Sequence, residues 1–284
     1  MLHEKAVLIV GAGGGLGRAQ ATLLARLGAR LVLNDIGCAP DGSGSDPAVV
    51  EAAAAEVRAL GGSVVTSSED LTAPGAADRL VELVRESYGR IDGAVFSAGI
   101  GRDRGLTKTS TEDLDRMLDV HVRGSFQLAR AAATAMIDAG SGGSIVLSTG
   151  PTAFFGTARK TAEALCAGAI AGFVRSAAIE LRRHGFRVNA IAPTARTRLT
   201  EDSPLFRGIA TTSMTPEHVA PLVAFLLADD ARDVHGDVLG VAGGRVYALQ
   251  SRETTGSFAE GRSFAADEIL KVYGEITRAG AAGT

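Results

Sequence analysis

Tryptophan is absent from the 284-residue chain, cysteine occurs only twice, and aromatic side chains make up 5% of the residues. Because Cys38 and Cys166 are the only thiols, a disulfide framework is excluded, and we expect a cytoplasmic protein in a reducing compartment. The formal net charge is only -3, and no basic run is longer than Arg182-Arg183. The chain therefore lacks the basic surface expected of a protein that binds nucleic acid.

Long apolar runs are also missing. Stretches such as residues 164–174 contain glycine and end at a charge, well short of the length that a bilayer span needs, so we expect no membrane insertion. Residues 1–5 lead directly into a strand-like segment, and we expect no secretory leader. What the chain does have is 46% apolar residues and 36 glycines, which is typical of a compact globule rich in turns.

Short apolar runs without polar alternation recur along the chain, and most of them are separated by alanine-rich stretches of helix length. Such runs are typical of buried strands in a parallel sheet. The expected strands span residues 7–10, 31–34, 63–66, 94–96, 145–147, 187–191 and 238–241, and the expected helices span 16–27, 48–60, 75–88, 112–138 and 161–184. Strands that alternate with helices in this way predict an α/β fold of the Rossmann type, with a doubly wound parallel sheet.

We expect a single domain over residues 1–244 and a C-terminal extension over 245–284, after the last expected strand. The extension contains an expected helix with one apolar face, formed by Ile269, Leu270, Tyr273 and Ile276. This face packs either on its own domain or on another protein.

A glycine-rich turn, GAGGGLG over residues 11–17, follows the first expected strand and opens the first helix. Glycines let the backbone approach a pyrophosphate, whose charge is met by free N–H groups and by the helix dipole. Asp35 ends the second strand, where a carboxylate accepts hydrogen bonds from an adenosine ribose and repels a 2′-phosphate. The pattern predicts NAD as the cofactor, although Arg18 is a candidate partner for a 2′-phosphate and leaves NADP open.

Several motifs resemble the short-chain dehydrogenase/reductase family, and they run through nearly the whole chain. They are the GxxxGxG spacing of Gly11, Gly15 and Gly17, then Asp70-Leu71, Ala98-Gly99 and the segment NAIAP over 189–193. More narrowly, segments 34–37, 89–92, 101–104 and 121–127 are similar to the (3R)-hydroxyacyl-CoA dehydrogenase domain of peroxisomal-type multifunctional enzymes. The resemblance implies one NAD-binding domain, dimers or tetramers formed through the long helices, and a small-molecule substrate of the acyl-CoA class.

The resemblance also implies roles for particular residues. Asp70 would bond the adenine amino group, Leu71 would flank the ring, and Thr197 would lie near the nicotinamide amide. Together with the glycine-rich turn, the expected cofactor-binding residues are Gly11, Gly15, Leu16, Gly17, Asp35, Asp70, Leu71, Ala98, Gly99, Pro193 and Thr197.

Hydride transfer between a nicotinamide and a carbonyl carbon needs an acid or base for the oxygen. The family uses a Ser together with a Tyr and a Lys four residues apart on one helix, but this chain has no YxxxK. An alignment without gaps puts Gly150 at the Ser position, Glu163 at the Tyr position and Ala167 at the Lys position. The neighbouring residues that are candidates to replace them are Ser148, Thr149, Lys160 and Cys166.

Glu163 and His121 are the remaining candidate catalytic residues. A carboxylate is ordinarily a base at neutral pH, and it becomes a proton donor only when it is desolvated. The two residues could then serve a non-redox step such as dehydration, or Glu163 could be the base of an oxidation. The alternative is that Glu163 is a polar residue without a chemical role and that His121 is hydrogen-bonded inside the domain.

Three functions therefore stay open. The first is a non-catalytic or specialised NAD-binding subunit, which forms a homo-oligomer or a hetero-oligomer with a catalytically complete homologue. The second is an active oxidoreductase on a secondary alcohol resembling a 3-hydroxyacyl-CoA. The third is a lyase or dehydratase. No metal site is expected, because the five histidines show no ligand spacing.

Overall fold

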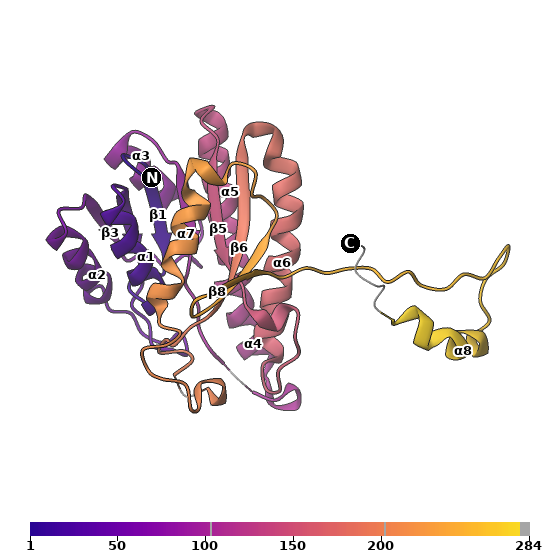
Figure 1. The fold of residues 1–284 in the computed structure, drawn as a ribbon. Coiled ribbons are helices and arrows are strands. Elements are labelled where there is room, and N and C mark those ends of the chain that lie inside the picture. Colours follow the sequence, from indigo (N-terminus) through magenta and orange to yellow (C-terminus); the bar gives the residue numbers. More distant parts are fainter. Residues whose placement is uncertain (103, 202, 279–284) are drawn as a thin grey trace. The chain divides into compact units, whose positions relative to one another are not determined.

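The computed structural model describes residues 1–102, 104–201 and 203–278 (Figure 1). The chain divides into a body, Met1–Leu249, and a C-terminal segment that begins at Gln250. The body holds the sheet and the candidate site, so the two parts are described separately.

The body is built on a sheet in which the described strands lie in the order β3-β2-β1-β4-β5-β6-β7-β8. The strands are β1 (Ala6–Val10), β2 (Arg30–Asn34), β3 (Val64–Ser67), β4 (Gly93–Phe96), β5 (Gly143–Ser148), β6 (Phe186–Thr194), β7 (Val238–Ala242) and β8 (Arg245–Ala248). All pair in parallel except β8, which pairs antiparallel with β7. Leu8, Val95 and Val146 are fully buried, because helices cover both faces of the sheet.

The helices form two layers, one on each face of the sheet (Figure 1). They are α1 (Gly15–Arg26), α2 (Ala48–Ala59), α3 (Ala76–Tyr88), α4 (Thr111–Met117), α5 (Gly124–Asp138), α6 (Thr161–Leu181) and α7 (Ala220–Leu227). Leu24 of α1, Val57 of α2 and Val223 of α7 belong to one core cluster. Leu80 of α3, Leu128 of α5 and Val174 of α6 belong to the cluster on the opposite face. The result is a doubly wound α/β fold.

Helix α6 contains the apolar run 164–174, for which the sequence analysis expects no membrane insertion. Among the described residues, only the helix over Thr161–His184 is long and apolar enough to cross a bilayer, by length and composition alone. Its residues Ile170, Val174 and Ala178 are buried in the core cluster against the sheet. One face of the helix therefore lies in the core, and 39% of its apolar window is buried.

The expected strands and helices lie close to their expected bounds, with three differences. The helix expected over 112–138 contains a π-helical segment, Leu118–Arg123, between α4 and α5. Helix α7 and strand β8 were not predicted. The boundary expected at 244/245 lies inside the sheet, because β8 pairs with β7 and Leu249 is buried in the core. Four residues after a Gly-Gly turn give too short a pattern to identify an antiparallel edge strand.

The C-terminal segment contains the expected helix as α8 (Ala266–Ile276). Arg262 pairs with Glu268, which also accepts a hydrogen bond from the Ala265 N–H and so fixes the start of the helix. Ile269, Leu270 and Tyr273 are exposed. The expected helix is therefore present, and its apolar residues Ile269, Leu270, Tyr273 and Ile276 all lie within α8.

Candidate functional site

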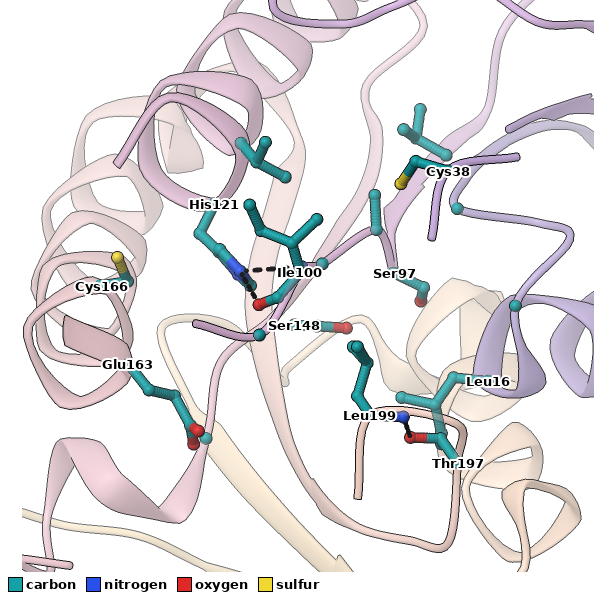
Figure 2. Close-up of a pocket in the computed structure, with 18 of the residues that line it drawn as sticks. Leu16, Cys38, Ser97, Ile100, His121, Ser148, Glu163, Cys166, Thr197 and Leu199 are labelled. Carbon is teal, nitrogen blue, oxygen red and sulfur yellow. Dashed lines mark hydrogen bonds between the residues drawn. The ribbon is translucent and has the colours of Figure 1, made fainter. Parts of the chain in front are cut away.

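The candidate site is a cleft at the carboxyl ends of the strands, where the strand order reverses between β1 and β4. In open α/β sheets, ligands bind at this switch point. Residues after β1, β2, β4, β5 and β6 line the cleft. In Figure 2, Leu16 and Cys38 lie on one side of it, whereas His121, Glu163 and Cys166 lie on the other.

The glycine-rich turn is shaped by close backbone contacts. Gly11 has φ +85°, and a Cβ there would collide with the backbone of Ala98. A Cβ on Gly17 would collide with the carbonyl oxygen of Gly11. Helix α1 begins at Gly15 and its N-cap Gly14 offers no side-chain cap, so the first N–H groups are available to an anion. Gly17 packs against the backbone of the turn, whereas Gly11, Gly15 and Leu16 line the cleft.

Asp35 lies at the carboxyl end of β2 and is 7% exposed. Its Oδ2 accepts the Gly13 N–H at 2.9 Å, and its Oδ1 accepts the Gly37 N–H at 2.7 Å. The carboxylate therefore holds the glycine-rich turn as well as lining the cleft. Each oxygen keeps a further lone pair for a ribose hydroxyl. The structural part of this role was not predicted from the sequence.

Arg18, the residue that left NADP open, is engaged elsewhere. Its Nε donates to Glu56 Oε2 at 2.9 Å, and its second guanidinium nitrogen also pairs with this carboxylate on α2. The pairing raises the pKa of the Arg18 guanidinium and lowers the pKa of Glu56. An arginine held in this way is less available to a 2′-phosphate than a free one.

The loops after β3 and β4 complete this side of the cleft. Asp70 Oδ1 accepts from the N–H of Thr72 at 2.9 Å and from its hydroxyl at 2.8 Å, which closes a turn. Asp70, Leu71, Ala98 and Gly99 all line the cleft. The cofactor-binding residues expected here are thus brought together around one cavity.

His121 lies on the π-helical segment and is held by the backbone. Its Nε2 lies 3.1 Å from the Ile100 nitrogen and 2.9 Å from the Ile100 oxygen (Figure 2). Burial lowers the pKa of His121, so the ring is neutral at pH 7. A Cβ on Gly99 would lie 2.9 Å from the ring, so only glycine leaves room for it. This geometry favours a bracing role for His121 at the cleft wall.

Gly150, Glu163 and Ala167, to which the sequence alignment assigns the family's proton relay, all line the cleft. A Cβ on Gly150 would lie 3.5 Å from Glu163 Oε1, so these positions face each other. Glu163 Oε2 pairs with Lys160 Nζ at 2.8 Å, and Oε1 accepts from the Thr152 hydroxyl at 3.3 Å. Ala167 is 4% exposed and carries no polar group to the cleft. Thr152 was missed in the sequence, which gave no signal for it.

The candidates to replace the relay are placed as follows. Burial raises the pKa of the Cys166 thiol to about 11, so it is protonated at neutral pH. Thr149 Oγ1 donates to the Ala167 carbonyl at 2.8 Å. Ser148 Oγ points into the cleft (Figure 2) and is a buried hydroxyl without a hydrogen-bond partner among the described residues. A ligand in the cleft is therefore the natural partner of Ser148.

The end of β6 and the loop after it form the remaining wall. Pro193 and Thr197 line the cleft, as expected. Thr197 Oγ1 accepts the Leu199 N–H at 3.2 Å and lies 3.2 Å from Thr200 Oγ1. Within the described residues, no group of three or more His, Cys, Asp or Glu side chains is arranged to hold a metal ion. The glycine cradle, Asp35 and the unpartnered Ser148 fit a dinucleotide.

Comparison with known proteins finds relatives that match most of this chain. Residues 11–245 match the protein family described as Enoyl-(Acyl carrier protein) reductase. A short-chain type dehydrogenase/reductase of Mycobacterium tuberculosis is 34% identical over 248 residues, which cover 87% of this chain and 85% of the relative. The hydroxyacyl-CoA dehydrogenase ChsB1 of the same organism is 34% identical over 280 residues, covering 94% and 87%. The peroxisomal multifunctional enzyme type 2 of Mus musculus is 35% identical over 261 residues, which cover 91% of this chain but only 34% of that longer enzyme.

Solved structures share the fold. A crystal structure of a short chain dehydrogenase from Mycobacterium avium has a TM-score of 0.84 at 32% identity, and the match covers 97% of this chain and 95% of that one. Carveol dehydrogenase from Mycobacterium avium, solved in complex with NAD, has a TM-score of 0.75 at 27% identity, covering 84% and 96%.

Proposed function

Because this chain belongs to the short-chain dehydrogenase/reductase family, we propose that it is an NAD(H)-binding homologue of the 3-hydroxyacyl-CoA dehydrogenases that acts as a non-catalytic or specialised subunit. One observation carries the proposal. The glycine-rich turn and Asp35 line the cleft, together with Gly150, Glu163 and Ala167, to which the gapless sequence alignment assigns the positions of the family's Ser, Tyr and Lys. The hydroxyl, phenol and ammonium of that relay act as a unit, so replacing all three removes the usual proton path.

The neighbouring Lys160, Cys166 and Thr149 do not rebuild this path. Lys160 comes from the N-cap position of α6 and pairs with the carboxylate, whereas the family ammonium lies one turn beyond the Tyr on the same helix. The Cys166 thiol is protonated, and the Thr149 hydroxyl donates to the backbone. NAD would be held by the glycine-rich turn, Asp35 and the loops after β3, β4 and β6. It would supply hydride transfer only where a proton relay accompanies it.

A second candidate function rests on the position of Glu163. Its carboxylate lines the cleft and faces Gly150, so it could serve as the base in oxidation of a 3-hydroxyacyl-CoA-like alcohol. A lyase or dehydratase using Glu163 with His121 is less well supported, because Nε2 of His121 is engaged with Ile100.

The deciding experiment is an assay of the purified full chain with NAD and with 3-hydroxyacyl-CoA and 3-oxoacyl-CoA substrates. The proposal expects binding of NAD by calorimetry and no turnover above background. Turnover typical of an enzyme that disappears in Glu163→Gln, while NAD binding is retained, would instead establish the second candidate. Consumption of substrate without a change in nicotinamide absorbance would select the lyase.

Oligomer formation is part of the same proposal. Phe126 on α5 and Leu165 and Ile179 on α6 are large apolar side chains that are 47%, 48% and 80% exposed. Exposed apolar side chains on neighbouring helices are typical of a subunit interface. We place this subunit in the cytoplasm, in a dimer or tetramer of like chains or with a catalytically complete homologue. Light scattering and co-purification from the source cell would distinguish these assemblies.

A further inference from the structure

The two halves of the cleft can be assigned to the two nucleotides from the topology. Asp35 follows β2, on one side of the switch point, and fits the adenosine ribose. The pyrophosphate belongs at the start of α1, in the middle. The second nucleotide therefore lies over β4, β5 and β6, on the side that holds Ser148 and Glu163 (Figure 2). This assignment rests on the cofactor site proposed above.

The charged side chains that line this part of the cleft are Glu163, Lys160 and Arg198. Arg198 lies in the loop after β6, and its charge also acts on Cys38, on the other side of the cleft. Glu163 is an acid that lines the cleft there, and its side chain is 34% exposed. Lys160 pairs with one of its oxygens, while the other oxygen faces Gly150. The neighbouring His121 and Cys166 are neutral at pH 7, because burial lowers the pKa of the former and raises that of the latter. Ala167 contributes no charge.

The two redox forms of a nicotinamide differ in charge at the ring. The oxidised ring carries one positive charge and the reduced ring is neutral, while the rest of the dinucleotide is the same. A fixed carboxylate near the ring therefore stabilises the oxidised form selectively, and a fixed ammonium does the opposite. Lys160 offsets part of the field of Glu163, but it lies on the Oε2 side of the carboxylate, away from the oxygen that faces Gly150.

We propose that Glu163 makes this cleft selective for the oxidised dinucleotide, NAD⁺, over NADH. The carboxylate attracts the positive charge of the oxidised ring and takes no part in proton transfer. The chain is then loaded according to the oxidised fraction of the cellular nicotinamide pool. In a subunit that does not turn over the cofactor, the redox state of the nicotinamide pool then sets how much of the protein has cofactor bound.

Calorimetric titration of the purified full chain with NAD⁺ and with NADH tests this inference. For the unchanged chain we expect NAD⁺ to bind about tenfold more tightly than NADH, with the offset from Lys160 included. Glu163→Gln keeps the shape and removes the charge, so the ratio of the two dissociation constants should fall to about one. Lys160→Met should increase the ratio, because it removes the offsetting charge. Glu86→Gln, an exposed carboxyl on α3 outside the cleft, is the matched control and should leave the ratio unchanged.

The outcomes separate this inference from the proposed function. Equal affinity for the two forms, or the same ratio in Glu163→Gln and in the unchanged chain, would overturn the selectivity. Failure of the unchanged chain to bind either form would overturn the cofactor site itself. Circular dichroism melting of each variant confirms that it is folded. The opposite shifts expected from Lys160→Met and Glu163→Gln keep the test decisive even if one variant is unstable.

Discussion

The two halves of the cleft use polar side chains in different ways. On the β2 side, Asp35 is oriented by two backbone N–H groups and stays directed at the cleft. On the α6 side, Glu163 is paired with Lys160 and accepts a hydrogen bond from Thr152, at the position that the sequence alignment assigns to the Tyr of the family's relay. The difference teaches that binding and chemistry depend on separate elements of this fold. Residues on the α6 side of the cleft can therefore change while the β2 side keeps the groups that fit the cofactor.

Rebuilding the relay should produce the largest effect. The triple variant Gly150→Ser, Glu163→Tyr, Ala167→Lys restores a hydroxyl, a phenol and an ammonium at positions that face one another. We expect oxidation of 3-hydroxyacyl-CoA to rise about a thousandfold above the unchanged chain, since a positioned acid–base group contributes about 10²–10⁴-fold. The matched control carries Phe at position 163 and should remain inactive. A silent triple variant that binds NAD normally would show that the two halves differ in more than the relay.

Damage to the pyrophosphate cradle should come next. Gly11→Ala places a Cβ against the backbone of Ala98 at φ +85°. We expect NAD binding to weaken about a hundredfold and the free energy of unfolding to fall by about 2 kcal/mol or more. Gly156→Ala is the control, because Gly156 is not among the residues that line the cleft and a Cβ there would meet no described atom within 4 Å. Similar losses in both variants would argue against the close approach of the turn to Ala98. Calorimetry and chemical denaturation provide the two readouts.

The buried thiol on the α6 side should give a pH-dependent effect. The pKa of Cys166 is raised from 9.0 to about 11 in the folded chain, chiefly by burial. A group with a raised folded pKa contributes stability that is complete below the unfolded pKa and is lost as pH rises through the folded value. Between pH 9 and 11, the unchanged chain should lose about 2 kcal/mol more unfolding free energy than Cys166→Ala. Parallel curves for the two proteins in urea denaturation would contradict the raised pKa.

The smallest effect is expected at Asp35. Asp35→Asn replaces one carboxylate oxygen by an NH₂ group. The side chain then has one acceptor fewer for the backbone N–H groups of the loop and for the ribose. We expect NAD affinity to fall about tenfold and discrimination against NADP to weaken, because the repelling charge is gone. Asp41→Asn, an exposed change in the neighbouring loop, is the control. An unchanged preference for NAD would shift cofactor selection to other residues.

Sequence patterns predicted the β2 half of the cleft better than the α6 half. A glycine turn and an acid after the next strand are local patterns with direct physical causes, so Gly11 and Asp35 were found without the structure. The alignment that pairs positions 150 and 163 stays a prediction, and in the structure a Cβ on Gly150 would lie 3.5 Å from Glu163 Oε1.

Contacts between segments far apart in sequence could not be predicted in this way. The bond from Thr152 to Glu163 joins a short loop turn to a helix, and the hold of Ile100 on His121 joins a loop to a π-helical segment. Neither contact leaves a periodic pattern. Lys160 and Glu163, three residues apart, lie at a spacing that pairs side chains on a helix. That spacing is visible in the sequence, unlike the two contacts between distant segments.

Helix α6 links two surfaces of the body. It begins at Thr161, beside the cleft, and continues to Leu181, so its 21 residues span about 30 Å as one stiff rod. Glu163 is anchored in its first turn, and the 80% exposed Ile179 lies in its last. A protein that grips the far end of this rod holds the same rigid body that carries the carboxylate. A neighbour that shifts α6 along its axis would move Glu163 by the same distance.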